Sequence, residues 1–187
     1  MDFQKLLIKI SKILGQLEIP YAITGGYAVS VWGRPRSTLD IDVIIELYRP
    51  QVRDLVIALK KTSKISYIEE GTVLEAVEQI GEFNFIHGDT GIKIDFFTTG
   101  KDPFSKIKLE RRVPKKILGK TVYFVSPEDL ILSKLEWYKQ SQSTRHLEDV
   151  ESIFKISAKK LDKKYLAHWA KKLKVEEIYC NALKAVV

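Results

Sequence analysis

The chain has 187 residues, of which 45% are hydrophobic and 29% charged, a balance that excludes a disordered chain and supports one domain with a buried core. Its single cysteine, Cys180, excludes an internal disulfide and a cysteine-based zinc site, and no apolar run is long enough to cross a membrane. The first residues do not have the pattern of a signal peptide, so we expect a cytoplasmic protein without a membrane partner.

The formal charge of +7 is unevenly distributed along the chain. Residues 1–100 carry 11 basic and 13 acidic side chains, net −2, whereas residues 101–187 carry 20 basic and 11 acidic side chains, net +9. Two interpretations of the basic half stay open. Its lysines either form a surface that contacts only water, or they form a lobe that binds a polyanion.

Hydrophobic periodicity predicts that helices and strands are mixed in residues 1–125. The expected helices are 2–16, 27–32 and 50–62. The expected strands are 21–24, 39–45, 65–68, 83–86 and 92–97, together with a hairpin that pairs 115–118 with 121–125. The hydrophobic periodicity of residues 72–80 is mixed and predicts neither a helix nor a strand.

From residue 126 onward the sequence is typical of helices. Ser126, Pro127 and two acidic residues after them form a strong helix start. Three more helices are expected at 144–157, 162–173 and 175–187. We therefore predict an α/β (α+β) fold in which residues 1–125 form a mixed β-sheet flanked by helices. Residues 126–187 are expected to form a C-terminal helical region packed on that core.

Three carboxylates interrupt apolar strands. Asp40 and Asp42 are two residues apart, so on a strand both point to the same face, and Asp95 lies within a later apolar strand. Carboxylates buried together need a compensating charge. Because Mg²⁺ binds a few carboxylates together with phosphate oxygens and water, these residues indicate a metal and phosphate site. Gly25-Gly26, at a strand-to-helix turn, allow backbone N–H groups to approach a phosphate.

This arrangement resembles the signature of the polymerase-beta-type nucleotidyltransferase superfamily, in which an apolar strand, Gly-Gly or Gly-Ser, Asp-x-Asp and a later third Asp follow one another. The run Arg36-Ser-Thr-Leu-Asp-Ile-Asp42 is similar to the AbiEii/AbiGii-like bacterial nucleotidyltransferases. The helix start at Ser126-Pro-Glu-Asp-Leu, with Lys134, and the later run Arg145–Val150 are similar to the same group. The resemblance covers about residues 20–155 and implies a nucleotidyltransferase-type sheet.

The resemblance implies an enzyme that transfers a nucleoside monophosphate from an NTP to a hydroxyl acceptor. Two Mg²⁺ ions, with Mn²⁺ as an alternative, are expected to bind Asp40, Asp42 and Asp95, and Asp95 is also expected to orient or deprotonate the acceptor hydroxyl. The residues expected to contact the NTP are Gly25, Gly26, Arg34, Arg36, Thr38 and Lys134.

Other interpretations of several side chains stay open. Arg34 and Arg36 are equally consistent with solvated loop residues, Thr38 with an ordinary loop threonine, and Lys134 with a surface lysine. Arg145 and Asp149, four residues apart on a helix, are interpreted first as a salt bridge. Three remaining residues are given structural interpretations: His87 and His146 are expected at the surface, and Cys180 in the core.

The acceptor stays open between RNA such as tRNA, a protein side chain and a small molecule, and the basic half favours an anionic acceptor. Two alternatives to an enzyme are a non-catalytic binding module of the same fold and a toxin–antitoxin component with an antitoxin-like partner. A plain nucleic-acid-binding domain is weaker, because it leaves Asp40 and Asp42 unexplained.

Overall fold

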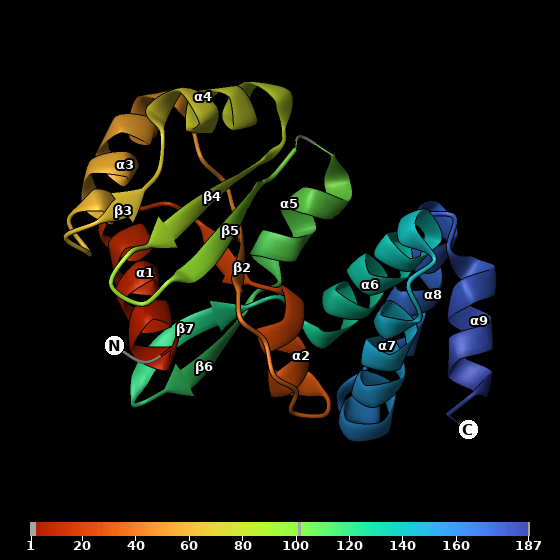
Figure 1. Cartoon of the computed structure of the whole chain (residues 1–187). Coiled ribbons are helices and arrows are strands. Elements are labelled where there is room, and N and C mark those ends of the chain that lie inside the picture. Colours follow the sequence, from red (N-terminus) through yellow and green to blue (C-terminus); the bar gives the residue numbers. More distant parts are fainter. Residues whose placement is uncertain (1–2, 101, 187) are drawn as a thin grey trace. The chain divides into compact units, whose positions relative to one another are not determined.

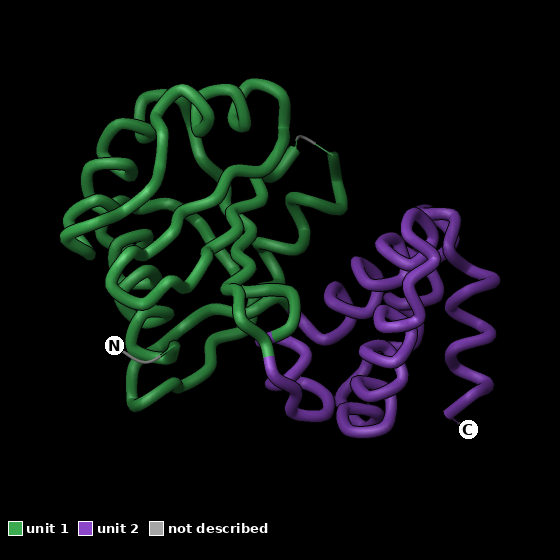
Figure 2. Tube along the Cα trace, in the orientation of Figure 1, with its two compact units in different colours: residues 1–26, 38–125 green, residues 27–37, 126–187 purple. Residues whose placement is uncertain are grey.

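The structure is a computed structural model that describes residues 3–100 and 102–186. The chain divides into two compact units, which Figure 2 draws in different colours. Unit 1 consists of residues 1–26 and 38–125, and unit 2 of residues 27–37 and 126–187. The second unit therefore contains the predicted C-terminal helical region together with a short segment from the first half of the chain.

A seven-stranded mixed sheet with the strand order β3-β4-β5-β2-β1-β7-β6 forms the centre of unit 1. Its strands are β1 (Tyr21–Ile23), β2 (Ile41–Ile45), β3 (Ser66–Tyr67), β4 (Glu82–His87), β5 (Ile92–Thr98), β6 (Val113–Ile117) and β7 (Lys120–Phe124). The pairs β2–β5 and β1–β7 are parallel, and the other pairs are antiparallel. Each strand predicted from the sequence overlaps one of these strands, which confirms the predicted mixed sheet.

Helices complete unit 1: α1 (Phe3–Gln16), α3 (Val52–Lys60) after the 3-10 turn η1 (Arg49–Gln51), α4 (Glu70–Gln79) and α5 (Pro103–Glu110). Helix α1 contacts α3, which contacts α4; in Figure 1, α1 and α3 lie at the left of the strands and α4 at the top. Fully buried leucine and isoleucine side chains of α1 and α3 form the core with inward-facing strand residues such as Phe85 and Phe96. This burial of apolar area holds the sheet and its helices together.

The alternation of β4 corrects one prediction. Phe83, Phe85 and His87 point to the buried face, so His87 is 0% exposed rather than at the surface. Its two ring nitrogens form hydrogen bonds with Thr90 Oγ1 (2.9 Å) and the Thr62 carbonyl (3.2 Å). A buried imidazole with both nitrogens paired is part of the core, because its hydrogen bonds replace those it loses to water.

Unit 2 is helical. Helix α2 (Gly25–Trp32) begins in unit 1 and continues into unit 2, which also contains α6 (Pro127–Ser141), α7 (Thr144–Ser157), η2 (Ala158–Lys160), α8 (Lys163–Lys172) and α9 (Glu176–Lys184). Helix α6 contacts α7 and α8, and α9 contacts α7 and α8. Ser157 Oγ donates to the Trp32 carbonyl (2.6 Å), and Ser152 Oγ accepts from the Arg34 backbone N–H (3.3 Å). These two hydrogen bonds connect the end of α2 and the loop after it to α7.

The predicted start of α6 is confirmed in detail. Ser126 is the N-cap and its hydroxyl accepts from the Asp129 backbone N–H, with Pro127 at the first helical position. The two acidic residues also connect α6 to α8: Glu128 accepts from the Asp162 backbone (2.9 Å) and Asp129 accepts from the Tyr165 hydroxyl (2.6 Å). The role of this motif in unit 2 is therefore to cap and anchor a helix.

The expected burial of Cys180 is wrong, because this side chain is exposed. The buried residues of α9 are Tyr179 and Ala182, which follow the buried Val175 at helical spacing, and Cys180 lies one position beyond that stripe. No helix in the described ranges, 3–100 and 102–186, is both long enough and apolar enough to span a bilayer.

Candidate functional site

Two of the three predicted carboxylates lie on the adjacent parallel strands β2 and β5 of unit 1, and the third precedes β2. Asp42 in β2 and Asp95 in β5 are direct register partners, so their side chains are neighbours on one face of the sheet. Asp40 lies in a bend immediately before β2, because the strand begins at Ile41 rather than at the predicted residue 39. All three side chains are partly exposed, as a site that receives a ligand requires.

A cation that was not assigned to the site from the sequence lies among these carboxylates. Lys93 is two residues before Asp95 in β5, and its Nζ lies 2.8 Å from Asp95 Oδ2. The hydrogen bond to Asp95 raises the pKa of Lys93 against partial desolvation, and the charges of Asp95, Asp40 and Asp42 raise it further. The alternation of β5 places Lys93 and Asp95 on one face, and this sequence pattern could have assigned Lys93 to the site.

Gly25 is packed directly against Asp42. Its φ is +60°, and a Cβ at this position would lie 1.9 Å from Asp42 Oδ2 and 2.7 Å from Asp42 Cβ. The Thr24 backbone N–H donates to the Asp42 carbonyl (2.9 Å), which fixes the turn between β1 and α2 beside β2. Only glycine fits this backbone conformation and this close approach without displacing its neighbour.

The donor set around Asp42 has the chemistry of a divalent-cation site, because it offers carboxylate oxygens from adjacent strands. In the described part of the chain, however, no three acidic, histidine or cysteine side chains are gathered as ready metal ligands. Asp95 is instead paired with the ammonium group of Lys93. The chain itself therefore supplies part of the positive charge that the cluster needs.

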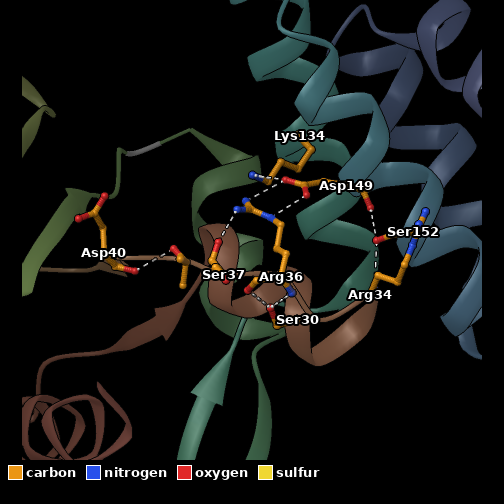
Figure 3. A network of polar contacts seen from close by, with 9 residues as sticks. Ser30, Arg34, Arg36, Ser37, Asp40, Lys134, Asp149 and Ser152 are labelled. Atoms are coloured by element: carbon orange, nitrogen blue, oxygen red, sulfur yellow. Dashed lines mark hydrogen bonds and ion pairs between the residues drawn. The ribbon is translucent and has the colours of Figure 1, made fainter. Parts of the chain in front are cut away.

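A second group of predicted residues belongs to unit 2 (Figure 3). Arg36 binds both oxygens of Asp149, with Nε 2.9 Å from Oδ1 and Nη2 3.2 Å from Oδ2, and Lys134 Nζ lies 2.9 Å from Oδ2. Asp149 is 4% exposed, and the Lys134 side chain only 10%, so the interpretation of Lys134 as an exposed surface lysine is wrong. The Ser30 hydroxyl, which both donates to and accepts from the Arg36 backbone (3.1 Å), holds Arg36 in place.

These contacts correct the expected salt bridge between Arg145 and Asp149. Asp149 faces the interior of unit 2, where Arg36 and Lys134 bind it, whereas Arg145 is exposed. An unpaired buried carboxylate costs much free energy, because it has lost its hydration, whereas an exposed arginine keeps its hydration without a partner. Burial therefore decides which residues pair. Helical spacing alone allowed the wrong partner.

His146, next to Arg145 in α7, is partly buried rather than at the surface as expected. Its Nδ1 is buried and has no hydrogen-bond partner among the described residues, 3–100 and 102–186. Desolvation, reinforced by the nearby charge of Lys134, lowers the pKa of this histidine. Two other predicted residues are in loops: Arg34 is exposed, and Thr38 donates from its hydroxyl to the Asp40 carbonyl (3.3 Å), which steadies the bend before β2.

A model of the family described as nucleotidyl transferase AbiEii toxin, type IV toxin–antitoxin system, matches residues 12–184. This chain belongs to the AbiEii family. The match spans both units, and it confirms the resemblance found in the sequence. No curated protein sequence matches this AbiEii member.

Solved structures are similar to this AbiEii member over most of its length. An antigenic nucleotidyltransferase-like protein from Paracoccidioides brasiliensis is 17% identical, with a TM-score of 0.57 over 98% of this chain and 93% of its own. The adenylyltransferase ANT(2")-Ia, solved with adenylyl-2"-tobramycin, is 16% identical (TM-score 0.57, 91% and 96% covered). The lincosamide adenylyltransferase LnuA, solved with lincomycin, is 12% identical (TM-score 0.55, 81% and 96% covered). These likenesses show that the fold is nucleotidyltransferase-like, as predicted.

Proposed function

We propose that this AbiEii member transfers a nucleoside monophosphate from an NTP to a hydroxyl acceptor and releases pyrophosphate. The observation that carries the proposal is the register pairing of Asp42 with Asp95, beside Asp40 and against Gly25. Carboxylates in this arrangement can bind two Mg²⁺ ions, with Mn²⁺ as an alternative. The bound ions would lower the pKa of the acceptor hydroxyl and neutralise the charge that develops on pyrophosphate.

The proposed reaction is an in-line displacement at the α-phosphorus of the NTP. The acceptor oxygen forms a bond to this phosphorus while the bond to the oxygen that bridges the α- and β-phosphates breaks. Pyrophosphate leaves with the bonding electron pair. In this proposal Asp40, Asp42 and Asp95 would hold the two cations, and Asp95 would also orient or deprotonate the acceptor hydroxyl.

For the nucleotide, we retain Gly25, Gly26, Arg34, Arg36, Thr38 and Lys134 as proposed contacts. The positive charge that Arg36 and Lys134 of unit 2 present to a phosphate is smaller than the sequence indicates. Because Asp149 binds both Arg36 and Lys134, the three side chains together carry +1 rather than the +2 of the two cations alone. Such a group still attracts a phosphate, and its fixed geometry lowers the entropy cost of binding.

The reaction is tested by incubating the protein with each α-³²P-labelled NTP, Mg²⁺ and total RNA or cell extract. We expect wild type to label an acceptor and Asp42→Asn to lose the labelling, because an amide is a poorer metal ligand than a carboxylate. Asp89→Asn is the matched control, since Asp89 is an exposed residue in the turn between β4 and β5 and loses the same charge.

Labelling by Asp42→Asn at the wild-type rate would exclude the proposed metal role. If wild type neither labels an acceptor nor binds any NTP in calorimetry with Mg²⁺, the non-catalytic binding module is the better description. Membership of a family of type IV toxin–antitoxin toxins also favours a toxin that works with an antitoxin-like partner. Growth arrest in cells that express wild type, but not in cells that express Asp42→Asn, would connect toxicity to the transfer reaction.

The surface of unit 2 supports RNA, such as tRNA, as the acceptor. Eight exposed lysines lie within twenty residues, at the end of α7, in η2 and in α8 with its following turn: Lys155, Lys159, Lys160, Lys163, Lys164, Lys171, Lys172 and Lys174. Lysines that contact phosphates release counterions, so the affinity for RNA falls with salt by about 0.7–0.9 logarithmic units per contact and per logarithmic unit of salt.

Replacing Lys159, Lys160, Lys163 and Lys164 together with glutamine should therefore weaken RNA binding and flatten its salt dependence. Fluorescence anisotropy with a labelled tRNA between about 50 and 200 mM salt measures both effects. The matched control replaces the same number of exposed lysines in unit 1 (Lys12, Lys60, Lys61 and Lys64). An equal loss in both variants would mean that overall charge, rather than this surface, attracts the RNA.

A further inference from the structure

Lys93, the cation beside the carboxylates of unit 1, has a side chain that can move away from them without a change in the backbone. Lys93 Nζ lies 2.8 Å from Asp95 Oδ2, which is one of the oxygens that the proposed function assigns to metal. The Lys93 side chain is 42% exposed and the Asp95 side chain 20%. A lysine ammonium on a flexible four-carbon stem that is open to water can exchange its partner without moving the backbone.

Lys93 and a divalent cation would compete for the same carboxylate. An ammonium group approaches an oxygen to about 2.8 Å and Mg²⁺ to about 2.1 Å, and both neutralise the same charge. With Lys93 in place, Asp40, Asp42, Asp95 and Lys93 carry −2 in total. A metal ion that binds Asp95 would therefore be repelled by the ammonium group of Lys93, which is paired with the same carboxylate. This repulsion is relieved only when Lys93 moves away.

We propose that Lys93 is a displaceable counterion of the metal site, which occupies Asp95 when no metal is bound and sets the metal concentration at which the site fills. The inference rests on the proposed function, because it takes Asp95 as a metal ligand. Lys93 is in this sense a positioning residue: it reduces repulsion among the carboxylates before metal arrives and makes metal binding weaker than the carboxylates alone would make it.

The test measures Mn²⁺ affinity by isothermal titration calorimetry for wild type, Lys93→Met, Lys93→Gln and Lys93→Arg. Removal of the charge in Lys93→Met and Lys93→Gln should tighten Mn²⁺ binding by roughly three- to tenfold. Lys93→Arg keeps the charge and should stay close to wild type. Lys64→Met, at an exposed lysine of unit 1, controls for the general loss of one positive charge.

A purely structural role gives a different pattern. It would lower the melting temperature of Lys93→Met without metal and leave the Mn²⁺ affinity unchanged, and that result would overturn the inference. Weaker Mn²⁺ binding in Lys93→Met would also overturn it, because Lys93 would then assist the metal. If wild type binds no Mn²⁺ at all, the proposed metal site fails together with this inference. If Asp42→Asn abolishes Mn²⁺ binding but Lys93→Met leaves it unchanged, the metal site stands and only this inference is overturned.

Discussion

Replacing Gly25 with alanine is expected to lower nucleotide transfer by about 100-fold and the free energy of unfolding by about 2–4 kcal/mol. The added Cβ would lie 1.9 Å from Asp42 Oδ2, a contact that rotation of the carboxylate could relieve. It would also lie 2.7 Å from Asp42 Cβ, which cannot rotate away because β2 is held between β1 and β5. The φ of +60° adds strain for any residue with a side chain.

Two measurements check this expectation: urea denaturation for the stability, and the rate of label transfer for the displacement of Asp42. Gly15→Ala is the matched control, because Gly15 lies in α1 and a Cβ there meets nothing within 4 Å. That variant should keep wild-type transfer and be up to about 1 kcal/mol more stable, since alanine favours a helix. Transfer by Gly25→Ala within twofold of wild type would contradict the close approach of Gly25 to Asp42.

The relation of Gly25 to Asp42 shows what the sequence could predict about the site. The strand-to-helix turn, the strand that contains Asp42 and the strand that contains Asp95 were all predicted, because each has a local pattern of apolar residues. The register between β2 and β5, which pairs Asp42 with Asp95, is set by the packing of the whole sheet. No local pattern encodes that register or the distance between Gly25 and the carboxylate.

Two helices were missed for different reasons. Helix α5 has the same start signal as the correctly predicted α6, with Asp102 as N-cap and Pro103 at the first position, but only two of its residues are buried, and so its apolar stripe is too weak to detect. Helix α4 buries Val73 and Ala76, and its mixed periodicity reflects that small contact area. Short helices with little buried surface depend on their neighbours more than on their own sequence.

Side-chain partners that are distant in the chain were the least predictable feature. The i, i+4 spacing favoured Arg145 as the partner of Asp149, whereas the structure brings Arg36 from 113 residues away. Spacing describes which contacts a helix permits, and burial decides which of them are needed. Lys93 is the opposite case: it lies only two residues from Asp95, and the alternation of β5 predicted that both share a face, although their contact was not predicted.

Replacing Asp149 with asparagine should lower the free energy of unfolding by about 3 kcal/mol, the second large effect that the structure implies. The side-chain exposure of Arg36 is 24% and that of Lys134 is 10%, so neither cation can regain full hydration when the carboxylate charge is lost. The amide of asparagine can accept a hydrogen bond from one cation but turns its own N–H donors toward the other. Thermal denaturation should show a melting temperature lower by about 6–12 °C.

Two further variants separate this network from a general effect of charge. Arg145→Ala should change the free energy of unfolding by less than about 0.5 kcal/mol, because Arg145 is exposed and is not the partner of Asp149. A loss as large as that of Asp149→Asn would mean that Arg145 holds the carboxylate after all. Lys134→Met combined with Asp149→Asn should cost less than the two single changes together, because removing the lysine also removes a cation that the asparagine leaves uncompensated.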